Sequence, residues 1–165
     1  MDDSTRALQV QEYFAAVGPR LRRQAYLVVR DWHTAEDMVQ TTFVKLYVAW
    51  PRIREDGLEA YTRRTLINAC LSHLRKHRRE TVPGELPDRS VDGTSGDLDL
   101  DRALALLPPR QRAVIALRYL EDLSVADVAE ALGVAPGTVK SQTAHALESL
   151  RALLPRLALD DEVTR

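Results

Sequence analysis

Residues 124–139 read SVADVAEALGVAPGTV, and this stretch decides the fold of the chain. Ser124 is a good N-cap for a helix that begins at the next residue, and Ala129 is small enough for a second helix to approach closely. Gly133 falls where the chain must turn sharply, because glycine adopts a positive φ at low cost. Pro136 suits the first turn of a following helix. The stretch therefore predicts two helices crossing at a tight turn. The apolar residues that fill the angle between them are Val128, Leu132, Val134 and Val139.

This arrangement is typical of a helix-turn-helix, whose second helix enters the major groove of DNA and reads bases from its N-terminal half. Backbone N–H groups near Gly137 and Thr138 are placed to hold a phosphate. The alternative is an ordinary helical hairpin, but the cap, the small residue, the glycine, the proline and the apolar positions all agree with DNA binding. Lys140 is the only Lys or Arg of this helix before Arg151, so the helix is expected to bind weakly by itself. The side chains expected to face DNA are Thr138, Lys140, Ser141, Gln142, Ala144 and His145.

Helical spacing of apolar residues continues on both sides of the motif, and no strand-like alternation occurs in the first half. The chain is therefore predicted to be all-α. A break is expected at Gly18-Pro19, and Thr34 is expected to cap a helix that Pro51 stops. The expected helices span 5–17, 19–30, 34–50, 58–78, 98–107, 109–120, 125–132 and 135–154. The expected core includes Leu8, Tyr13, Phe14, Val17, Ala35, Met38, Val39, Phe43, Leu46, Tyr47, Val114, Leu117 and Leu120.

Residues 80–98 differ from both halves, since Pro, Gly, Ser, Thr and acidic residues dominate there. Such a composition is typical of a flexible linker. The charge separates in the same way: residues 80–101 carry a net charge of −6, whereas the blocks before and after them carry +5 and +2. Two mildly basic blocks indicate nucleic-acid contact by each block. The predicted organisation is two small helical domains, 1–79 and 99–158, joined by the flexible acidic linker 80–98 and followed by an acidic tail, 159–165.

The composition narrows the class of protein. Apolar residues make up 45% and charged residues 28% of the 165 residues, as in a soluble globular protein. The longest apolar stretches are far too short to span a bilayer, and the acidic start, Met1-Asp2-Asp3, argues against a secretory signal. Cys70 is the only cysteine, which excludes an internal disulfide and fits a reducing cytosol. We expect a cytoplasmic protein without membrane insertion. It lacks a Gly-rich phosphate loop, a nucleophile–base pattern and paired acids, so we do not expect an enzyme.

Six cations and no acid lie between residues 60 and 79. A basic helix end that complements its own dipole accounts for one or two of them, so the phosphates of a nucleic-acid strand are the expected partners. Tyr61 and Trp50 can stack on an unpaired base, although such residues are more often half-buried. The six cations are Arg63, Arg64, Arg75, Lys76, Arg78 and Arg79.

Cys70, His73 and His77 share one face of the same predicted helix, a spacing that can form part of a zinc site. A fourth ligand is not evident, and so basic a helix disfavours a cation. The sequence therefore predicts neither a metal nor a cofactor.

Three motifs of this chain resemble the extracytoplasmic-function (ECF) sigma factors of the sigma-70 family. Residues 107–114, LPPRQRAV, followed by LRY and then GTVKS at 137–141, resemble region four, which reads the minus-35 promoter element. Residues 35–43, AEDMVQTTF, resemble the region-two helix that docks on core RNA polymerase. Residues 61–79 resemble the region-two segment that captures the minus-10 element and opens the duplex. The resemblance covers nearly the whole folded chain. It implies a sigma factor that binds core RNA polymerase and directs promoter recognition and transcription initiation.

The resemblance also implies roles for individual residues in region two. Asp37 and Gln40 match polar residues that contact the polymerase clamp, and Thr41 and Phe43 are assigned to the same contact. Thr41 stands where many relatives have Glu. Asn68 matches a position near the flipped minus-10 base. The residues assigned to the minus-10 element are Tyr61, Arg63, Arg64, Asn68, Arg75, Lys76, Arg78 and Arg79.

In region four, the resemblance assigns Lys140, Ser141, Ala144 and His145 to the minus-35 element. His145 replaces a frequent Arg, and Gln142 replaces a frequent basic residue. The implied partners are core RNA polymerase and promoter DNA. An inhibitory anti-sigma factor is a common third partner in this family, although nothing in these residues shows one.

Two other classes of protein compete with this interpretation. A one-component regulator would carry the same helix-turn-helix behind a sensing or dimerisation domain, and it would bind a palindrome without polymerase. An adaptor that merely binds polymerase would keep its activity when its DNA contacts are lost. A sigma factor instead needs an asymmetric promoter with two elements.

Overall fold

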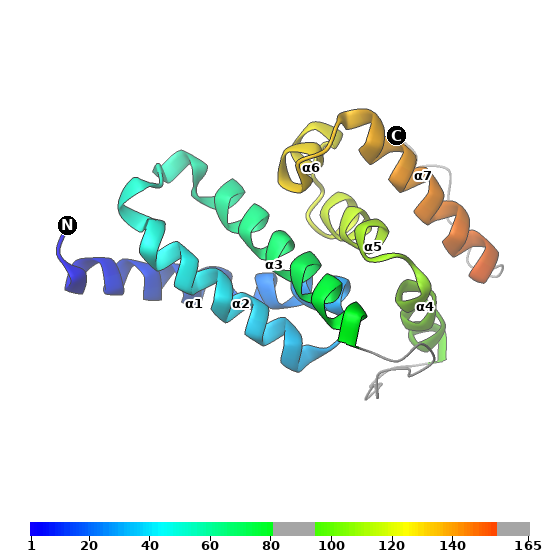
Figure 1. Ribbon diagram of the computed structural model, residues 1–165, viewed down its shortest axis with the longest axis horizontal. Helices are drawn as coiled ribbons and strands as arrows, with labels where there is room; N and C mark the ends of the chain where they lie inside the picture. The colour runs from blue at the N-terminus through cyan, green and yellow to red at the C-terminus, as the bar shows by residue number, and fades with distance from the viewer. Residues whose placement is uncertain (81–94, 155–165) are drawn as a thin grey trace.

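The computed structural model describes residues 1–80 and 95–154, with side chains for residues 1–78 and 100–154. All regular elements in these ranges are helical (Figure 1), which confirms the all-α prediction. The predicted tail lies outside the described residues, and so does most of the predicted linker. None of the described helices is long and apolar enough to cross a membrane. The elements are α1 (Asp3–Val29), α2 (Trp32–Ala49), η1 (Trp50–Arg52), η2 (Glu55–Gly57), α3 (Leu58–Glu80), α4 (Ser95–Leu106), α5 (Pro109–Ile115), η3 (Ala116–Leu120), α6 (Val125–Leu132) and α7 (Pro136–Leu153).

Helix α1 continues through Gly18 and Pro19, so the break predicted there is wrong. A proline inside a helix removes a backbone hydrogen bond and costs about 3 kcal/mol. Packing offsets this cost, because Gly18 is buried beneath the ring of Phe14 and the following turns of α1 are buried against α2 and α3. The helix ends at Arg30, which adopts a left-handed conformation with φ of 62°.

The cap of α2 also differs from the prediction. The residue at the N-cap is Asp31, whose Oδ2 accepts the backbone N–H of Thr34 at 2.8 Å and its hydroxyl at 2.7 Å. The helix therefore begins at Trp32, and Thr34 lies in its first turn as a donor to the cap. Helix α2 ends at Ala49, and Pro51 lies in the short turn η1 that follows. The predicted stop at Pro51 is therefore confirmed, because proline cannot continue the hydrogen bonding of an α-helix.

The predicted core is mostly confirmed, with three exceptions. Leu46, Val114 and Leu117 are fully buried, whereas Leu8 and Phe14 are exposed. The buried side of α1 follows Val10, Leu21, Ala25 and Val28, which leaves Leu8 on the outer side. Leu120 is also exposed. Leu120 is the last residue of η3, which is a π-helical turn. A π-helical turn contains more residues than an α-helical one, so the side chains at its end point in other directions than a regular α-helix predicts.

The helix-turn-helix is formed as predicted by α6 and α7. Ser124 Oγ accepts the backbone N–H of Asp127 at 3.1 Å and caps α6. Gly133 ends α6 with φ of 67°, and Pro136 occupies the first turn of α7. Val128 and Val139 are completely buried at the crossing, beside Ala129. A second buried cluster joins α4 to the far end of α7 through Leu104, Leu107, Ala146, Leu150 and Leu154.

The two halves of the chain lie against each other (Figure 1). A single buried cluster contains residues of α1, α2 and α3 together with residues of α5, α6 and α7. Helix α6 packs on α3, and α5 packs on α1. The helices that the sequence assigns to the minus-10 element and to the helix-turn-helix are therefore neighbours in this structure.

Candidate polymerase and nucleic-acid interfaces

One exposed strip runs along α2. It consists of Asp37, Gln40, Thr41, Val44 and Val48, and we call it the docking strip. The spacing of three or four residues places these side chains on one face of the helix. Val44 is 66% and Val48 62% exposed, so two adjacent apolar side chains lie beside the polar ones and are not covered by the residues that the structure describes. Such a strip suits a protein partner, because an apolar centre with a polar edge is common in protein interfaces.

Phe43 does not belong to this strip, which corrects its assignment to the polymerase contact. Its side chain lies in the core, with its ring centroid 4.8 Å from that of Phe14 and 5.9 Å from that of Tyr13. Phe43 shares the inward face with Val39 and Leu46. Val44 and Val48 were not among the residues predicted for this contact, although their spacing from Gln40 and Thr41 indicates the same face.

A cleft of about 570 Å³ lies where η1 and η2 lead into α3. We call it the Tyr61 cleft. Tyr61 is half-buried in its wall, and the guanidinium of Arg64 lies 5.7 Å from the centroid of its ring. Arg52 and Arg54 from the preceding turns add two more cations, and Ile53 adds an apolar surface. An aromatic ring with several arginines suits an unpaired nucleotide, because the ring can stack on a base while the cations contact phosphates.

Tyr61 and Arg64 are among the residues predicted to bind the minus-10 element, whereas Arg52, Ile53 and Arg54 are not. The segment RIR after Pro51 is the signal that could have identified them. Trp50 is half-buried, which is the alternative to base stacking that the sequence left open. Its Nε1 donates to Gln9 Oε1 at 2.9 Å, and its ring packs near Tyr13. Trp50 therefore supports the fold and does not line the Tyr61 cleft.

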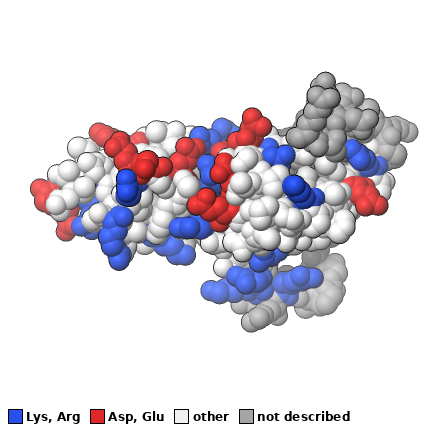
Figure 2. Space-filling view, turned by 90° about the horizontal axis from the view of Figure 1, so that it is seen from above, with Lys and Arg blue, Asp and Glu red and all other residues white. Residues whose placement is uncertain are grey.

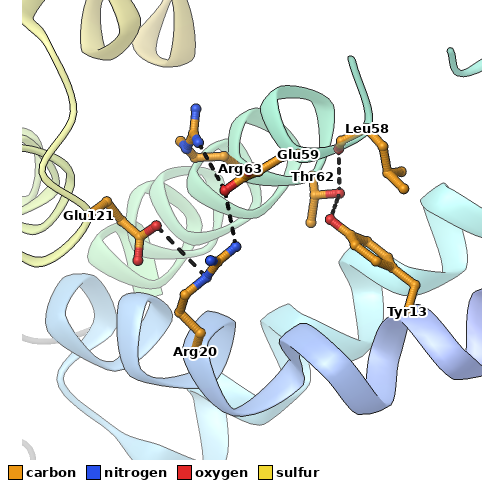
Figure 3. A network of polar contacts seen from close by, with 7 residues as sticks. All are labelled: Tyr13, Arg20, Leu58, Glu59, Thr62, Arg63 and Glu121. Atoms are coloured by element: carbon orange, nitrogen blue, oxygen red, sulfur yellow. Dashed lines mark hydrogen bonds and ion pairs between the residues drawn. The ribbon is translucent and has the colours of Figure 1, made fainter. Parts of the chain in front are cut away.

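Arg63 is already engaged in an ionic network (Figure 3). Its guanidinium lies 3.6 Å from Glu59, which also contacts Arg20 at 3.3 Å, and Arg20 lies 3.8 Å from Glu121 of the C-terminal half. The side chain of Arg63 is only 12% exposed. In this structure, Arg63 therefore lacks the exposure that a phosphate contact requires.

The remaining cations of α3 gather near its C-terminal end. Arg75, Lys76 and Arg78 are exposed, and Asn68 is exposed about two to three turns before them. Arg75 Nη2 also donates to Ser72 Oγ at 3.2 Å. Only the backbone of Arg79 is described, and it is helical. Figure 2 shows Lys and Arg side chains gathered at one edge of the molecule, with acidic and basic side chains mixed elsewhere on the same face.

The side chains of Cys70, His73 and His77, which share one face of α3, do not form a metal site. Cys70 is completely buried, and burial raises the pKa of its thiol to about 12. The rings of His73 and His77 stack on each other with centroids 5.6 Å apart. Among the described residues, no group of three or more His, Cys, Asp or Glu residues is arranged to hold a metal ion.

Helix α7 presents most of the predicted DNA-reading residues to solvent. Thr138, Lys140, Ser141, Ala144 and His145 are exposed, and Gln142 is half-buried. The hydroxyl of Ser141 donates to Thr138 O at 3.1 Å, so its oxygen remains available as an acceptor. The N–H of Thr138 donates to Ala135 O at 3.0 Å, which leaves Gly137 as the first-turn donor best placed for a phosphate.

Comparisons with known proteins match two family models to this chain. The family described as sigma-70 region 2 matches residues 13–80, and the family described as sigma-70 region 4 matches residues 97–150. The RNA polymerase sigma-E factor of Streptomyces avermitilis is 39% identical over 160 residues, which cover 93% of this chain and 89% of that protein. The ECF RNA polymerase sigma factor SigM of Mycobacterium tuberculosis is 34% identical and is covered over 71% of its length, with 82% of this chain.

Solved structures show the same fold. The sigma factor RpoE in complex with the anti-sigma factor NepR, from Bartonella quintana, aligns with a TM-score of 0.73 at 28% identity. This alignment covers 88% of the present chain and 96% of that chain, so both halves are included.

Proposed function

Because the chain belongs to the ECF sigma factors of the sigma-70 family, which bind core RNA polymerase and promoter DNA, we propose that three of its surfaces divide this work. The docking strip on α2 binds core polymerase, the Tyr61 cleft and α3 take the minus-10 element, and α7 reads the minus-35 element. The protein acts by binding and leaves bond chemistry to the polymerase. Its place of action is then the cytoplasm, where its partners are found.

The docking strip is the observation that carries this proposal. Nothing in the described fold covers Val44 and Val48, yet each valine costs about 1.5 kcal/mol or more to leave in water when a partner could bury it. Asp37 and Gln40 next to them supply polar contacts that fix the orientation of a partner. A surface of this kind is expected on the face that binds polymerase.

The Tyr61 cleft supports the assignment of α3 to the minus-10 element. Its size and its content of one ring and three arginines suit a base turned out of the stack. Arg75, Lys76 and Arg78 lie further along the same helix, about 20–26 Å from Tyr61 at 1.5 Å per residue. Several successive phosphates of one strand fit in that length.

The N-terminal half of helix α7 has one exposed lysine for phosphate contact and otherwise small or neutral side chains for base contact. Its affinity for DNA is therefore low, and useful binding depends on tethering to the first half and to polymerase. The complex of RpoE with NepR supports the further proposal that an anti-sigma factor controls this chain.

Val44→Glu and Val48→Glu test the docking strip. Each variant places a charge in the interface and should weaken binding to core RNA polymerase about tenfold or more, because about 1.5 kcal/mol of apolar burial is lost. Leu106→Glu is the matched control, since Leu106 is as exposed as Val44 but lies on α4. Equal affinity of all three variants and the wild type in a fluorescence titration would refute the assignment.

A further inference from the structure

A second cleft, of about 600 Å³, lies between α1 and the turns η1 and η2, and we call it the Trp50 cleft. We propose that it binds an organic cation, an ammonium or guanidinium group carried on an alkyl stem. The cleft shares only Ile53 with the Tyr61 cleft, and no residue of the docking strip lines it. Cation binding there is thus separate from the proposed function. Among the residues that line the Trp50 cleft are Glu12, Tyr13, Trp50, Ile53, Glu55 and Leu58.

Two aromatic rings line the cleft, and hydrogen bonds hold both in place. The ring centroids of Tyr13 and Trp50 lie 5.9 Å apart, with the ring planes inclined at 52°. Trp50 Nε1 donates to Gln9 Oε1 at 2.9 Å. The hydroxyl of Thr62 donates to Leu58 O at 2.7 Å, so the Tyr13 hydroxyl, 3.1 Å away, is the donor to Thr62 Oγ1 (Figure 3). Rings fixed in this way attract a cation over a face without having to be ordered first.

The charge that lines the cleft is negative. Glu12 and Glu55 are both exposed, and neither belongs to an ion pair within the part of the chain that the structure describes. No Lys or Arg side chain lines this cleft, whereas three arginines line the Tyr61 cleft. The positive end of α3 accounts for an acidic residue at Glu55, but Glu12 lies well inside α1. Two such carboxylates favour a cation and oppose a phosphate.

The apolar part of the lining suits an alkyl stem. Ile53 and Leu58 are half-buried at the cleft. An alkyl stem lies along such a surface while its charged head reaches a carboxylate. The volume is that of a site for a small organic ligand.

A bare metal ion fits this lining less well, because it would use neither the rings nor the apolar surface. In the ranges with described side chains, no three His, Cys, Asp or Glu residues are arranged to hold one. The chemistry of the cleft therefore points to an organic cation. A free polyamine and an arginine or lysine side chain of another protein share this chemistry.

Heteronuclear NMR of the full chain tests the site through its two tryptophans. Trp50 lines the cleft and Trp32 does not, so the indole N–H of Trp32 is an internal control, and Trp32→Phe identifies the two signals. The probes are spermidine and the peptide acetyl-Gly-Arg-Gly-amide, each titrated at constant ionic strength. The Trp50 signal should shift and saturate with at least one probe, while the Trp32 signal stays in place. The probe that saturates it at the lower concentration identifies the source of the cation.

Single changes of charge test the role of the carboxylates. Glu12→Gln and Glu55→Gln should each raise the Kd for the bound probe about threefold. Glu148→Gln on α7 is the matched control, because it removes the same charge from an exposed residue outside the cleft and should leave the Kd unchanged. The cation site is overturned if neither probe shifts the Trp50 signal to saturation, if both tryptophan signals shift equally, or if the three variants bind with equal Kd.

Discussion

Replacing Arg112 should destabilise the protein more than replacing Arg110, the other basic residue of α5. Arg112 is 7% exposed, and its guanidinium donates hydrogen bonds to Val28 O at 2.9 Å, Leu107 O at 2.9 Å and Ala105 O at 3.2 Å. Val28 O belongs to the last turn of α1, whose carbonyls lack partners within the helix. The last turn of α1 contains no basic residue, so Arg112 supplies the positive charge that stabilises the C-terminal end of this helix.

The expected loss of stability follows from the two hydrogen bonds of 2.9 Å, to Val28 O and Leu107 O. Each hydrogen bond from a charged donor is worth about 1.5 kcal/mol or more, so Arg112→Met should cost about 3 kcal/mol. Methionine fills most of the space and limits any cavity. For a domain of this size, about 3 kcal/mol lowers Tm by about 6–12 °C. Arg112→Lys keeps the charge but loses the planar fork, so its effect should be smaller.

Thermal unfolding followed by circular dichroism at 222 nm measures this effect. Arg110→Met is the matched control, because Arg110 is exposed two residues earlier on the same helix and should change Tm by less than about 2 °C. If Arg112→Met and Arg110→Met shift Tm equally, the buried hydrogen bonds do not stabilise the fold as argued.

Three further predictions concern DNA contact, pH and thiol chemistry. Lys140→Ala should reduce minus-35-dependent transcription and lower the slope of log affinity against log salt by about 1, whereas Arg102→Ala on α4 should do neither. Asp31→Ala should cost about 1 kcal/mol at pH 7. Hydrogen bonds donated to its carboxylate by Thr34, first from the hydroxyl and then from the backbone N–H, hold the pKa of Asp31 below its ordinary value of 3.8. This stabilisation is therefore present above that value and lost as the pH falls below it, and urea titrations should show the stabilities of the wild type and the variant converging as the pH is lowered. Cys70 should stay unmodified by Ellman's reagent at pH 8 until the protein unfolds, since burial raises its pKa to about 12; rapid reaction of the folded protein would contradict the burial.

Local signals in the sequence were sufficient for the helix-turn-helix. The cap at Ser124 and the positive φ at Gly133 depend on residues within one turn, so their types identify them directly. The prediction at Pro19 was wrong because tertiary packing of α1 outweighs the local preference of proline. The prediction that Leu120 belongs to the core is wrong because it requires a regular α-helix, whereas the structure has a π-helical turn there.

The binding surfaces were predicted only in part, because they depend on which residues the fold covers. Phe43 matches the motif of the docking helix, yet its ring completes the core while Val44 is exposed. Arg63 was expected to be exposed, but Glu59 and α6 enclose it. The Tyr61 cleft joins residues of η1, η2 and α3, and only the folded chain brings them together.

Transcription from a genomic template shows whether this chain selects promoters for core RNA polymerase. Purified protein is added to core RNA polymerase, and the 5′ ends of the transcripts are mapped at several salt concentrations. The account predicts specific start sites, absent with core polymerase alone, that share two upstream elements in one orientation. If no specific start sites appear at any salt concentration, or if the shared sequence is a palindrome bound without polymerase, the assignment of this chain as a promoter-selecting sigma factor is contradicted.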